Sequence, residues 1–185
     1  HDLGGDGRFN LYNALKTVLE LNAHRMNRTV VSFWDRVTLA GRAMKVHDAK
    51  YDCFDSPSAP SLGTITANGI KINTIFTPLL ENKQVGSAKF SSGVAVVELT
   101  PSMSKNLISA VANEENVKVI TLKTLGEGNI PSCFIPEIEK LTQAGKIIVL
   151  ASPFSGGSVG RSAYALGAAA IQAGAIPAGD MTLPT

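Results

Sequence analysis

The sequence predicts an α/β protein, and two observations in its second half favour this class. Apolar runs short enough for buried strands alternate there with longer segments of helical periodicity. Such alternation is typical of a parallel sheet with right-handed crossovers. Residues 94–97 and 147–150 are almost continuously apolar, which predicts strands that are covered on both faces.

The elements of the second half follow one another regularly. We expect strands and helices in strict alternation, the strands at residues 94–99, 117–122 and 147–150 and the helices at residues 102–112, 131–144 and 162–173.

Two segments of the first half carry clear signals of secondary structure. A β-branched and aromatic run at residues 29–34 predicts a buried strand, and a second extended piece is expected near residues 70–75, with loops between them. After Gly7, apolar residues recur at three- and four-residue spacing, which predicts an amphipathic helix. The residues with this spacing are Phe9, Leu11, Tyr12, Leu15, Val18, Leu19 and Leu21.

A change of composition divides the chain. Residues 78–92 are mostly polar or small and show no apolar periodicity, so we expect a linker there. The linker separates a first domain at residues 1–77 from a second at residues 93–185.

Composition and charge argue against several classes of function. The 17 basic and 15 acidic residues leave a net charge of +2, and the basic residues are scattered, so we expect no nucleic-acid partner. Cys53 and Cys133 have no zinc-site spacing and are expected to be free thiols in a reducing compartment. The longest apolar stretch, residues 163–178, is interrupted by glycine, glutamine and proline, which argues against a membrane span.

Two glycine-rich loops should lie where α/β sheets bind ligands, beyond the carboxyl ends of the strands. They are residues 125–131 and 152–160, and the alternative for the first is a plain strand-to-helix connection. The second loop differs from a phosphate loop, because Ser155 replaces the first glycine and Arg161 replaces the lysine. No nucleophile elbow is present, and the three histidines have no triad spacing. The residues alone therefore indicate a small-molecule site without specifying a reaction.

Five segments, taken in order, resemble the motifs of the bacterial-type asparaginase family and in particular its cytosolic, type I-like members. Each segment alone is a weak signal, but their common order and spacing make a strong one. They are residues 6–14 (DGxxNLxNA), 41–47 (GxxxKxH), 54–57 (FxSP), 126–131 (GxGNxP) and 174–182 (GxxxxxDMT).

This resemblance implies a fold and an activity. The fold would be a parallel-sheet, three-layer sandwich: the end of an N-terminal catalytic domain, then an incomplete, smaller Rossmann-like C-terminal domain. The activity would be hydrolysis of L-asparagine to L-aspartate and ammonia by a threonine nucleophile. The nucleophilic threonines have no counterpart in this chain, so the resemblance implies an inactive fragment. It further implies a cytoplasmic homodimer or homotetramer with no cofactor and no metal.

Two residues match functional positions of that family. Lys45 matches the lysine that assists the threonine hydroxyl, where an amine can tune proton transfer; otherwise it is a solvated surface lysine. Asn129 matches an asparagine that contacts substrate across a subunit interface. A carboxamide both donates and accepts hydrogen bonds, but Asn129 together with Ser132 is equally suited to cap the following helix.

Other functions remain open at this point. The same resemblance extends to the asparaginase-like subunit of a transfer-RNA-dependent amidotransferase, and a non-catalytic small-molecule-binding module could use the same scaffold. The strand at residues 29–34 would have an unpaired edge in this chain, which predicts poor solubility when the chain is expressed alone.

Overall fold

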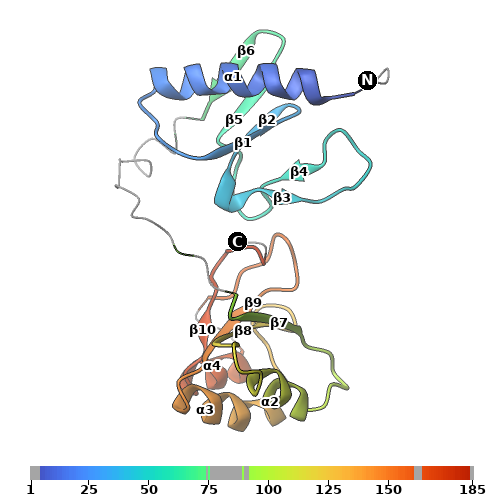
Figure 1. Cartoon of the computed structure of the whole chain (residues 1–185), viewed down its shortest axis with the longest axis vertical. Coiled ribbons are helices and arrows are strands. Elements are labelled where there is room, and N and C mark those ends of the chain that lie inside the picture. Colours follow the sequence, from blue (N-terminus) through green and yellow to red (C-terminus); the bar gives the residue numbers. More distant parts are fainter. Residues whose placement is uncertain (1–4, 74, 76–88, 90–91, 161–163, 184–185) are drawn as a thin grey trace. The chain divides into compact units, whose positions relative to one another are not determined.

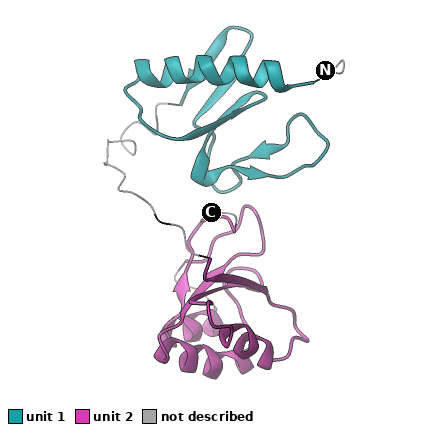
Figure 2. Ribbon diagram, viewed as in Figure 1, with its two compact units in different colours: residues 1–87, 185 teal, residues 88–184 magenta. Residues whose placement is uncertain are grey.

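In the computed structural model the chain forms two compact units (Figure 2). Unit 1 comprises residues 1–87 with Thr185, and unit 2 comprises residues 88–184. The residues described are 5–73, 75, 89, 92–160 and 164–183. Apart from Lys89 and Ser92, the predicted linker lies outside the described residues, as do the first two residues of the helix predicted at residues 162–173.

In the described part of unit 1, an α-helix lies across an antiparallel sheet (Figure 1). The helix α1 spans Gly7–Ala23. The sheet has the order β1-β2-β5-β6, and its strands are Val30–Phe33, Arg36–Leu39, Gly63–Thr66 and Gly69–Ile72. A short 3-10 helix at Ala40–Arg42 leads into a separate hairpin of β3 (Met44–Lys45) and β4 (Phe54–Asp55).

The strand predicted at residues 29–34 forms β1, and its unpaired edge is present among the described residues. β1 ends the sheet and pairs there with β2. Four strands lie where loops were expected or where no element was predicted: β2, β3, β4 and β5. The turn between β1 and β2 explains part of this difference. Trp34 lies in this turn with φ of 53°, a conformation that a bulky side chain rarely adopts. The turn also lacks the Asn-Gly or Asp-Gly pair from which a tight hairpin is usually predicted.

The helix predicted after Gly7 forms, but it is not oriented as an amphipathic helix usually is. Its buried residues are Asn13, Thr17 and Leu21. The Thr17 hydroxyl donates to the Asn13 carbonyl oxygen at 2.7 Å and lies 3.0 Å from the Ser32 hydroxyl on β1. The large apolar residues face outward instead and are 48–66% exposed: Phe9, Leu11, Tyr12, Leu15, Val18 and Leu19. The side of α1 facing the sheet is therefore the more polar one.

Unit 2 confirms the predicted α/β class. Its sheet has the order β10-β9-β8-β7 with every pair parallel. The strands are β7 Val94–Glu98, β8 Val119–Lys123, β9 Ile147–Ala151 and the two-residue β10 Ile176–Pro177, which was not predicted. The helices are α2 Asn106–Ala112, α3 Ile135–Gln143 preceded by a 3-10 turn at Ser132–Phe134, and α4 Ala165–Gln172.

The core of unit 2 lies on one face of this sheet. Ile120, Leu122, Ile148 and Leu150 are fully buried there against side chains of α2, α3 and α4, and Figure 1 shows these helices on that face. The crossovers all run in the same direction along the sheet, so their right-handed sense places every helix on the same side.

The opposite face of the sheet is bare among the described residues. The register aligns Val94 with Val119 and Ile147 in one row, and Val96 with Thr121, Val149 and Ile176 in the next. Both rows are apolar except at Thr121. Four of these residues are 46–59% exposed: Val94, Val96, Ile147 and Ile176. The prediction that residues 94–97 and 147–150 are covered on both faces is therefore wrong for this part of the chain. An apolar run predicts a strand, but it does not determine whether helices pack against both faces of the sheet.

Candidate active site

Three loops meet beyond the carboxyl ends of the parallel strands in unit 2. The backbone N–H and the hydroxyl of Thr124 both donate to the Ala151 carbonyl oxygen, at 2.9 and 3.0 Å, which joins the ends of β8 and β9. Val159 and Gly179 exchange two backbone hydrogen bonds of 2.8 Å. Both predicted loops and the segment at residues 174–182 therefore lie along one edge of the sheet.

The first loop is closed on itself by its own backbone. The Leu125 N–H donates to the Asn129 carbonyl oxygen at 2.8 Å, and the Asn129 N–H returns a bond of 3.2 Å. Gly128 has φ of +86°, and a Cβ atom there would lie 2.8 Å from Cγ1 of Val159 in the second loop. A glycine is thus required both by the backbone conformation and by the close approach of the two loops.

Asn129 is half-buried and held at its backbone, and its side chain makes no hydrogen bond within the described residues. The helix-capping alternative receives no support, because neither the 3-10 turn at Ser132–Phe134 nor α3 has a side-chain cap. Its carboxamide is therefore available to donate to and accept from a ligand.

Lys45 lies in unit 1, on β3. The register pairs Lys45 with Phe54 and Met44 with Asp55, so two of the motif segments, 41–47 and 54–57, are neighbouring strands. The hydrogen bond from the Val46 N–H to the Cys53 carbonyl oxygen, 2.8 Å, continues this pairing. Lys45 is exposed, and its side-chain ammonium makes no hydrogen bond or ion pair with the part of the chain that the structure describes.

Arg36 positions the hairpin that carries Lys45, a role that no motif or spacing indicated. Its Nη1 lies 2.7 Å from Oδ1 of Asp55, and its Nη2 lies 3.1 Å from Oδ2 of Asp52. The rings of Phe33 and Phe54 pack beside them with centroids 5.0 Å apart. The charged groups are partly exposed, so each ion pair contributes about 0–1 kcal/mol and serves mainly to orient the hairpin.

The remaining candidate groups do not form a site within the described residues. His24 contacts Glu20 on its own helix, and Nε2 of His47 lies 3.4 Å from the Lys50 ammonium, so neither belongs to a triad. His1 and Arg161 lie outside the described residues. In the described ranges, no three His, Cys, Asp or Glu side chains are grouped to hold a metal ion, and no helix is long and apolar enough to cross a membrane.

Both halves of the sequence match models of one protein family. The Asparaginase, N-terminal model matches residues 1–77, and the Glutaminase/Asparaginase C-terminal domain model matches residues 93–185. The chain belongs to the glutaminase/asparaginase family. Lys45 and Asn129 thus lie in different units of an asparaginase-family chain, one in each matched region.

Individual members of the asparaginase family resemble the chain over nearly its whole length. L-asparaginase 1 of Escherichia coli K12 is 28% identical over 184 residues, which are 98% of this chain and 53% of that protein. The solved structure of the thermostable L-asparaginase from Thermococcus kodakarensis matches with a TM-score of 0.80 and 25% identity, covering 98% of this chain and 54% of its own. A glutamyl-tRNA(Gln) amidotransferase subunit of Thermofilum pendens is 28% identical over 142 residues, 76% of this chain and 31% of that protein. The chain therefore spans about half the length of the asparaginases that it matches.

Proposed function

We propose that this chain is part of an L-asparaginase that hydrolyses the side-chain amide of L-asparagine to L-aspartate and ammonia. The observation that carries the proposal is the match of both halves, in order, to the N- and C-terminal asparaginase models. The nucleophile would be a threonine supplied by sequence that has no counterpart in these 185 residues. The chain alone is then expected to release no ammonia from asparagine.

In this proposal Lys45 assists the threonine. A hydroxyl is a weak nucleophile until a neighbouring group accepts its proton, and an amine can do so or can stabilise the charge that develops. The exposed position of Lys45 at the end of β3 supports this role, because the ammonium is accessible to groups brought by the rest of the enzyme. The ion pairs of Arg36 with Asp52 and Asp55 would then act as positioning contacts for the hairpin.

Asn129 would contact the substrate. Its side chain has no partner among the described residues, and the closed Leu125–Asn129 loop limits the positions that the carboxamide can take. The amino acid part of asparagine offers an ammonium group to the carboxamide oxygen and a carboxylate to its NH₂ group. Asn129→Ala should therefore raise KM more than it lowers kcat, because it removes a binding contact.

We further propose a cytoplasmic homodimer or homotetramer. Cys53 and Cys133 are both free thiols, one buried and one exposed, as suits a reducing compartment. Analytical ultracentrifugation of the active, family-length protein would distinguish these assemblies from a monomer.

The similarity to a glutamyl-tRNA(Gln) amidotransferase favours one alternative function, a glutamine-dependent amide transfer onto charged transfer RNA. The two candidates are distinguished by joining this chain to the part of E. coli L-asparaginase 1 that it lacks. An asparaginase releases ammonia from free asparagine with no other component present. If this fusion protein folds but is inactive until transfer RNA and a second protein are added, the asparaginase proposal fails.

A further inference from the structure

The turn between β1 and β2 contacts one arm of the hairpin that carries Lys45. The rings of Phe33 and Phe54 have centroids 5.0 Å apart. The next residue, Trp34, stacks on Tyr51, with centroids 5.3 Å apart and an interplanar angle of 12°. Phe54 pairs with Lys45 in the hairpin. Both aromatic contacts therefore reach the arm that lies directly beside Lys45.

Trp34 has an unusual backbone conformation at this contact. Consecutive side chains of a strand point to opposite faces, so a strand that continued through residue 34 would direct the rings of Phe33 and Trp34 apart. Instead, φ of Trp34 is 53°, in the left-handed region that bulky side chains rarely adopt. Such a conformation persists only where the surrounding contacts hold it, and it is found most often at functional sites. The left-handed turn brings two consecutive rings against the same hairpin.

Contacts with the start of α1 hold Trp34 in this conformation. Its N–H donates to Oδ1 of Asn10 at 2.9 Å, and Nδ2 of Asn10 donates to Oδ2 of Asp6, also at 2.9 Å. The ring of Phe9 lies tilted against the indole, with centroids 5.6 Å apart. Trp34 thus joins the first turn of α1 to the hairpin.

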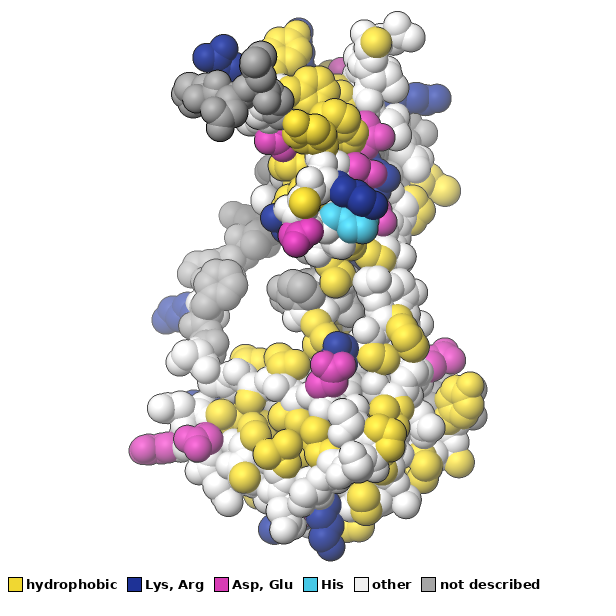
Figure 3. Space-filling view, turned by 90° about the vertical axis from the view of Figure 1, so that its right-hand side faces the viewer, with side chains coloured by type: hydrophobic (Ala, Val, Ile, Leu, Met, Phe, Trp, Pro, Cys, Tyr) yellow, Lys and Arg dark blue, Asp and Glu magenta, His cyan; other side chains and the backbone are white. Residues whose placement is uncertain are grey.

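Burial in the core does not account for the stack, because Trp34 is 37% exposed and Tyr51 is 50% exposed. Figure 3 faces the side on which the β3–β4 loop projects in Figure 1, and there hydrophobic side chains lie at the surface of unit 1 beside basic and acidic ones. The strands β3 and β4 have only two residues each. A hairpin this short is not stable by itself, so contacts from outside it determine where it lies.

We propose that Trp34 and Tyr51 are positioning residues for Lys45. Their stack fixes the hairpin so that the Lys45 side chain meets the threonine hydroxyl supplied by the rest of the enzyme, and the inference therefore rests on the proposed function. A group that exchanges a proton must lie within about 2.6–3.2 Å of its partner, so a displacement of the hairpin by about 1 Å is enough to slow the reaction. Trp and Tyr side chains have two torsions each, so their stack restrains the arm more tightly than the long side chain of Arg36 does.

Substitutions of Tyr51 test the stack without changing the backbone at Trp34. Tyr51→Leu removes the stacked ring but keeps an apolar side chain, and Tyr51→Phe is the conservative control that keeps the ring. Trp34 is the only tryptophan of the chain, so quenching of its fluorescence by acrylamide reports on the stack, and Tyr51→Leu should increase it.

Hydrogen exchange shows whether the hairpin itself is loosened. The Val46 N–H bonds to the Cys53 carbonyl oxygen within the hairpin, and we expect Tyr51→Leu to speed its exchange about tenfold. Exchange of the amide of Val37, a fully buried residue of β2, should stay unchanged, because the loss is local. Tyr51→Phe should leave both amides as they are.

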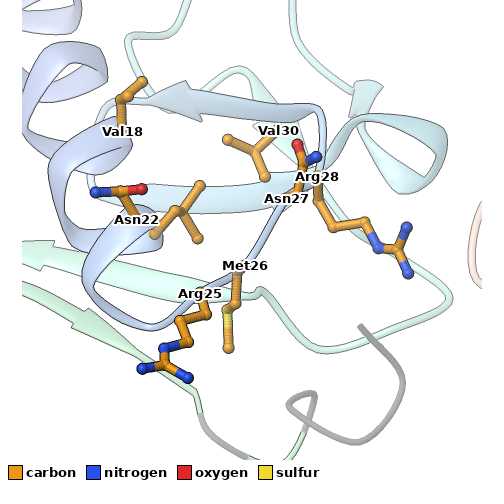
Figure 4. A pocket seen from close by; sticks show the side chains of 8 residues that line it. Val18, Asn22, Arg25, Met26, Asn27, Arg28 and Val30 are labelled. Carbon is orange, nitrogen blue, oxygen red and sulfur yellow. The ribbon is translucent and has the colours of Figure 1, made fainter. Parts of the chain in front are cut away.

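Glycine substitutions separate the stack from the strained backbone. Among the described residues, Arg25 is the other non-glycine residue with positive φ, 55°, and it is exposed just beyond the C-terminal end of α1. Figure 4 shows it beside a hollow of about 690 Å³, with its guanidinium group extending away from that of Arg28. Trp34→Gly and Arg25→Gly both relieve an unfavourable conformation, but only Trp34→Gly removes the stack. We expect only Trp34→Gly to speed exchange of the Val46 amide.

Turnover tests the link to Lys45, in the fusion of this chain with the part of E. coli L-asparaginase 1 that it lacks. We expect Tyr51→Leu and Trp34→Gly to lower kcat about tenfold or more and to change KM less than about twofold, because they misplace Lys45 and leave the substrate contacts intact. Tyr51→Phe and Arg25→Gly should keep full activity.

The possible outcomes distinguish this inference from the proposed function. The positioning role is wrong if Tyr51→Leu leaves Val46 exchange unchanged, speeds Val37 exchange equally, or loosens the hairpin while the fusion keeps its normal kcat. If the exchange results are as expected but the folded, unsubstituted fusion releases no ammonia from asparagine, the asparaginase assignment fails, and the stack is still shown to fix the hairpin.

Discussion

Replacing Gly128 with alanine should destabilise unit 2 by two separable effects. The residue has φ of +86°, where an alanine costs about 1–2 kcal/mol. The new Cβ would also lie 2.8 Å from Cγ1 of Val159, which is fully buried and cannot move into solvent. Overpacking of this kind costs about 1–3 kcal/mol, so the total loss in the free energy of unfolding should be about 2–5 kcal/mol.

Gly145 offers a matched control for the backbone effect. Its φ is +85°, and a Cβ there would meet nothing within 4 Å, so Gly145→Ala should cost only the backbone strain. The difference between the two variants, about 1–3 kcal/mol, then isolates the contact with Val159.

Hydrogen exchange of the Ile120 and Ile148 amides in the core of unit 2 measures both costs. The fluorescence of Trp34, the only tryptophan, reports on unit 1 and should not change. If Gly128→Ala destabilises unit 2 no more than Gly145→Ala does, the proposed close packing of the two loops is wrong.

Three further variants test other parts of the structure. Ser56 is buried with no hydrogen-bond partner for its hydroxyl in the described chain, so Ser56→Ala should be neutral or stabilising by up to about 1 kcal/mol in urea unfolding; a loss above about 1 kcal/mol would reveal an unrecognised partner. Arg36→Leu should cost only about 0–2 kcal/mol but should speed exchange of the Val46 amide; unchanged exchange would show that the hairpin needs no anchor. Val96→Lys on the bare sheet face should raise solubility without lowering the melting temperature, and a clear drop in that temperature would mean that the face is covered.

The fold of unit 2 could be predicted well because each of its strands and helices, β10 apart, has a local signal. Residues 94–97 and 147–150 are apolar runs, and the observed β7 and β9 differ by a single residue at one end from the strands predicted at residues 94–99 and 147–150. β10 could not be predicted, because two residues carry no periodicity and its pairing with Val149 and Leu150 arises only in the folded chain.

Unit 1 was harder to predict, and the reason is visible in α1. The spacing from Phe9 to Leu21 identifies the helix correctly, but which side faces the sheet depends on the layers that are present. Here Asn13 and Thr17 face the sheet, while Leu15 and Leu19 are exposed. A hydrophobic stripe predicts burial against some partner, and that partner is not among the described residues.

The two candidate site residues could be predicted only from the resemblance of the sequence to asparaginase-family motifs. Lys45 is an ordinary lysine by composition, and nothing in residues 41–57 predicts that it pairs with Phe54. The approach of Gly128 to Val159 likewise joins two loops that are far apart in sequence. The structure does not support helix capping by Asn129, because α3 begins at Ile135 and has no side-chain cap.

The role of Lys45 is tested most directly by turnover of the fusion protein with and without its ammonium group. The fusion joins this chain to the part of E. coli L-asparaginase 1 that it lacks, and ammonia release from L-asparagine is measured for Lys45→Met and for the control Lys50→Met. We predict that Lys45→Met lowers kcat about 100-fold or more, as loss of a proton-transfer group does, while Lys50→Met retains full activity. Normal turnover by the folded Lys45→Met protein would contradict the proposed mechanism.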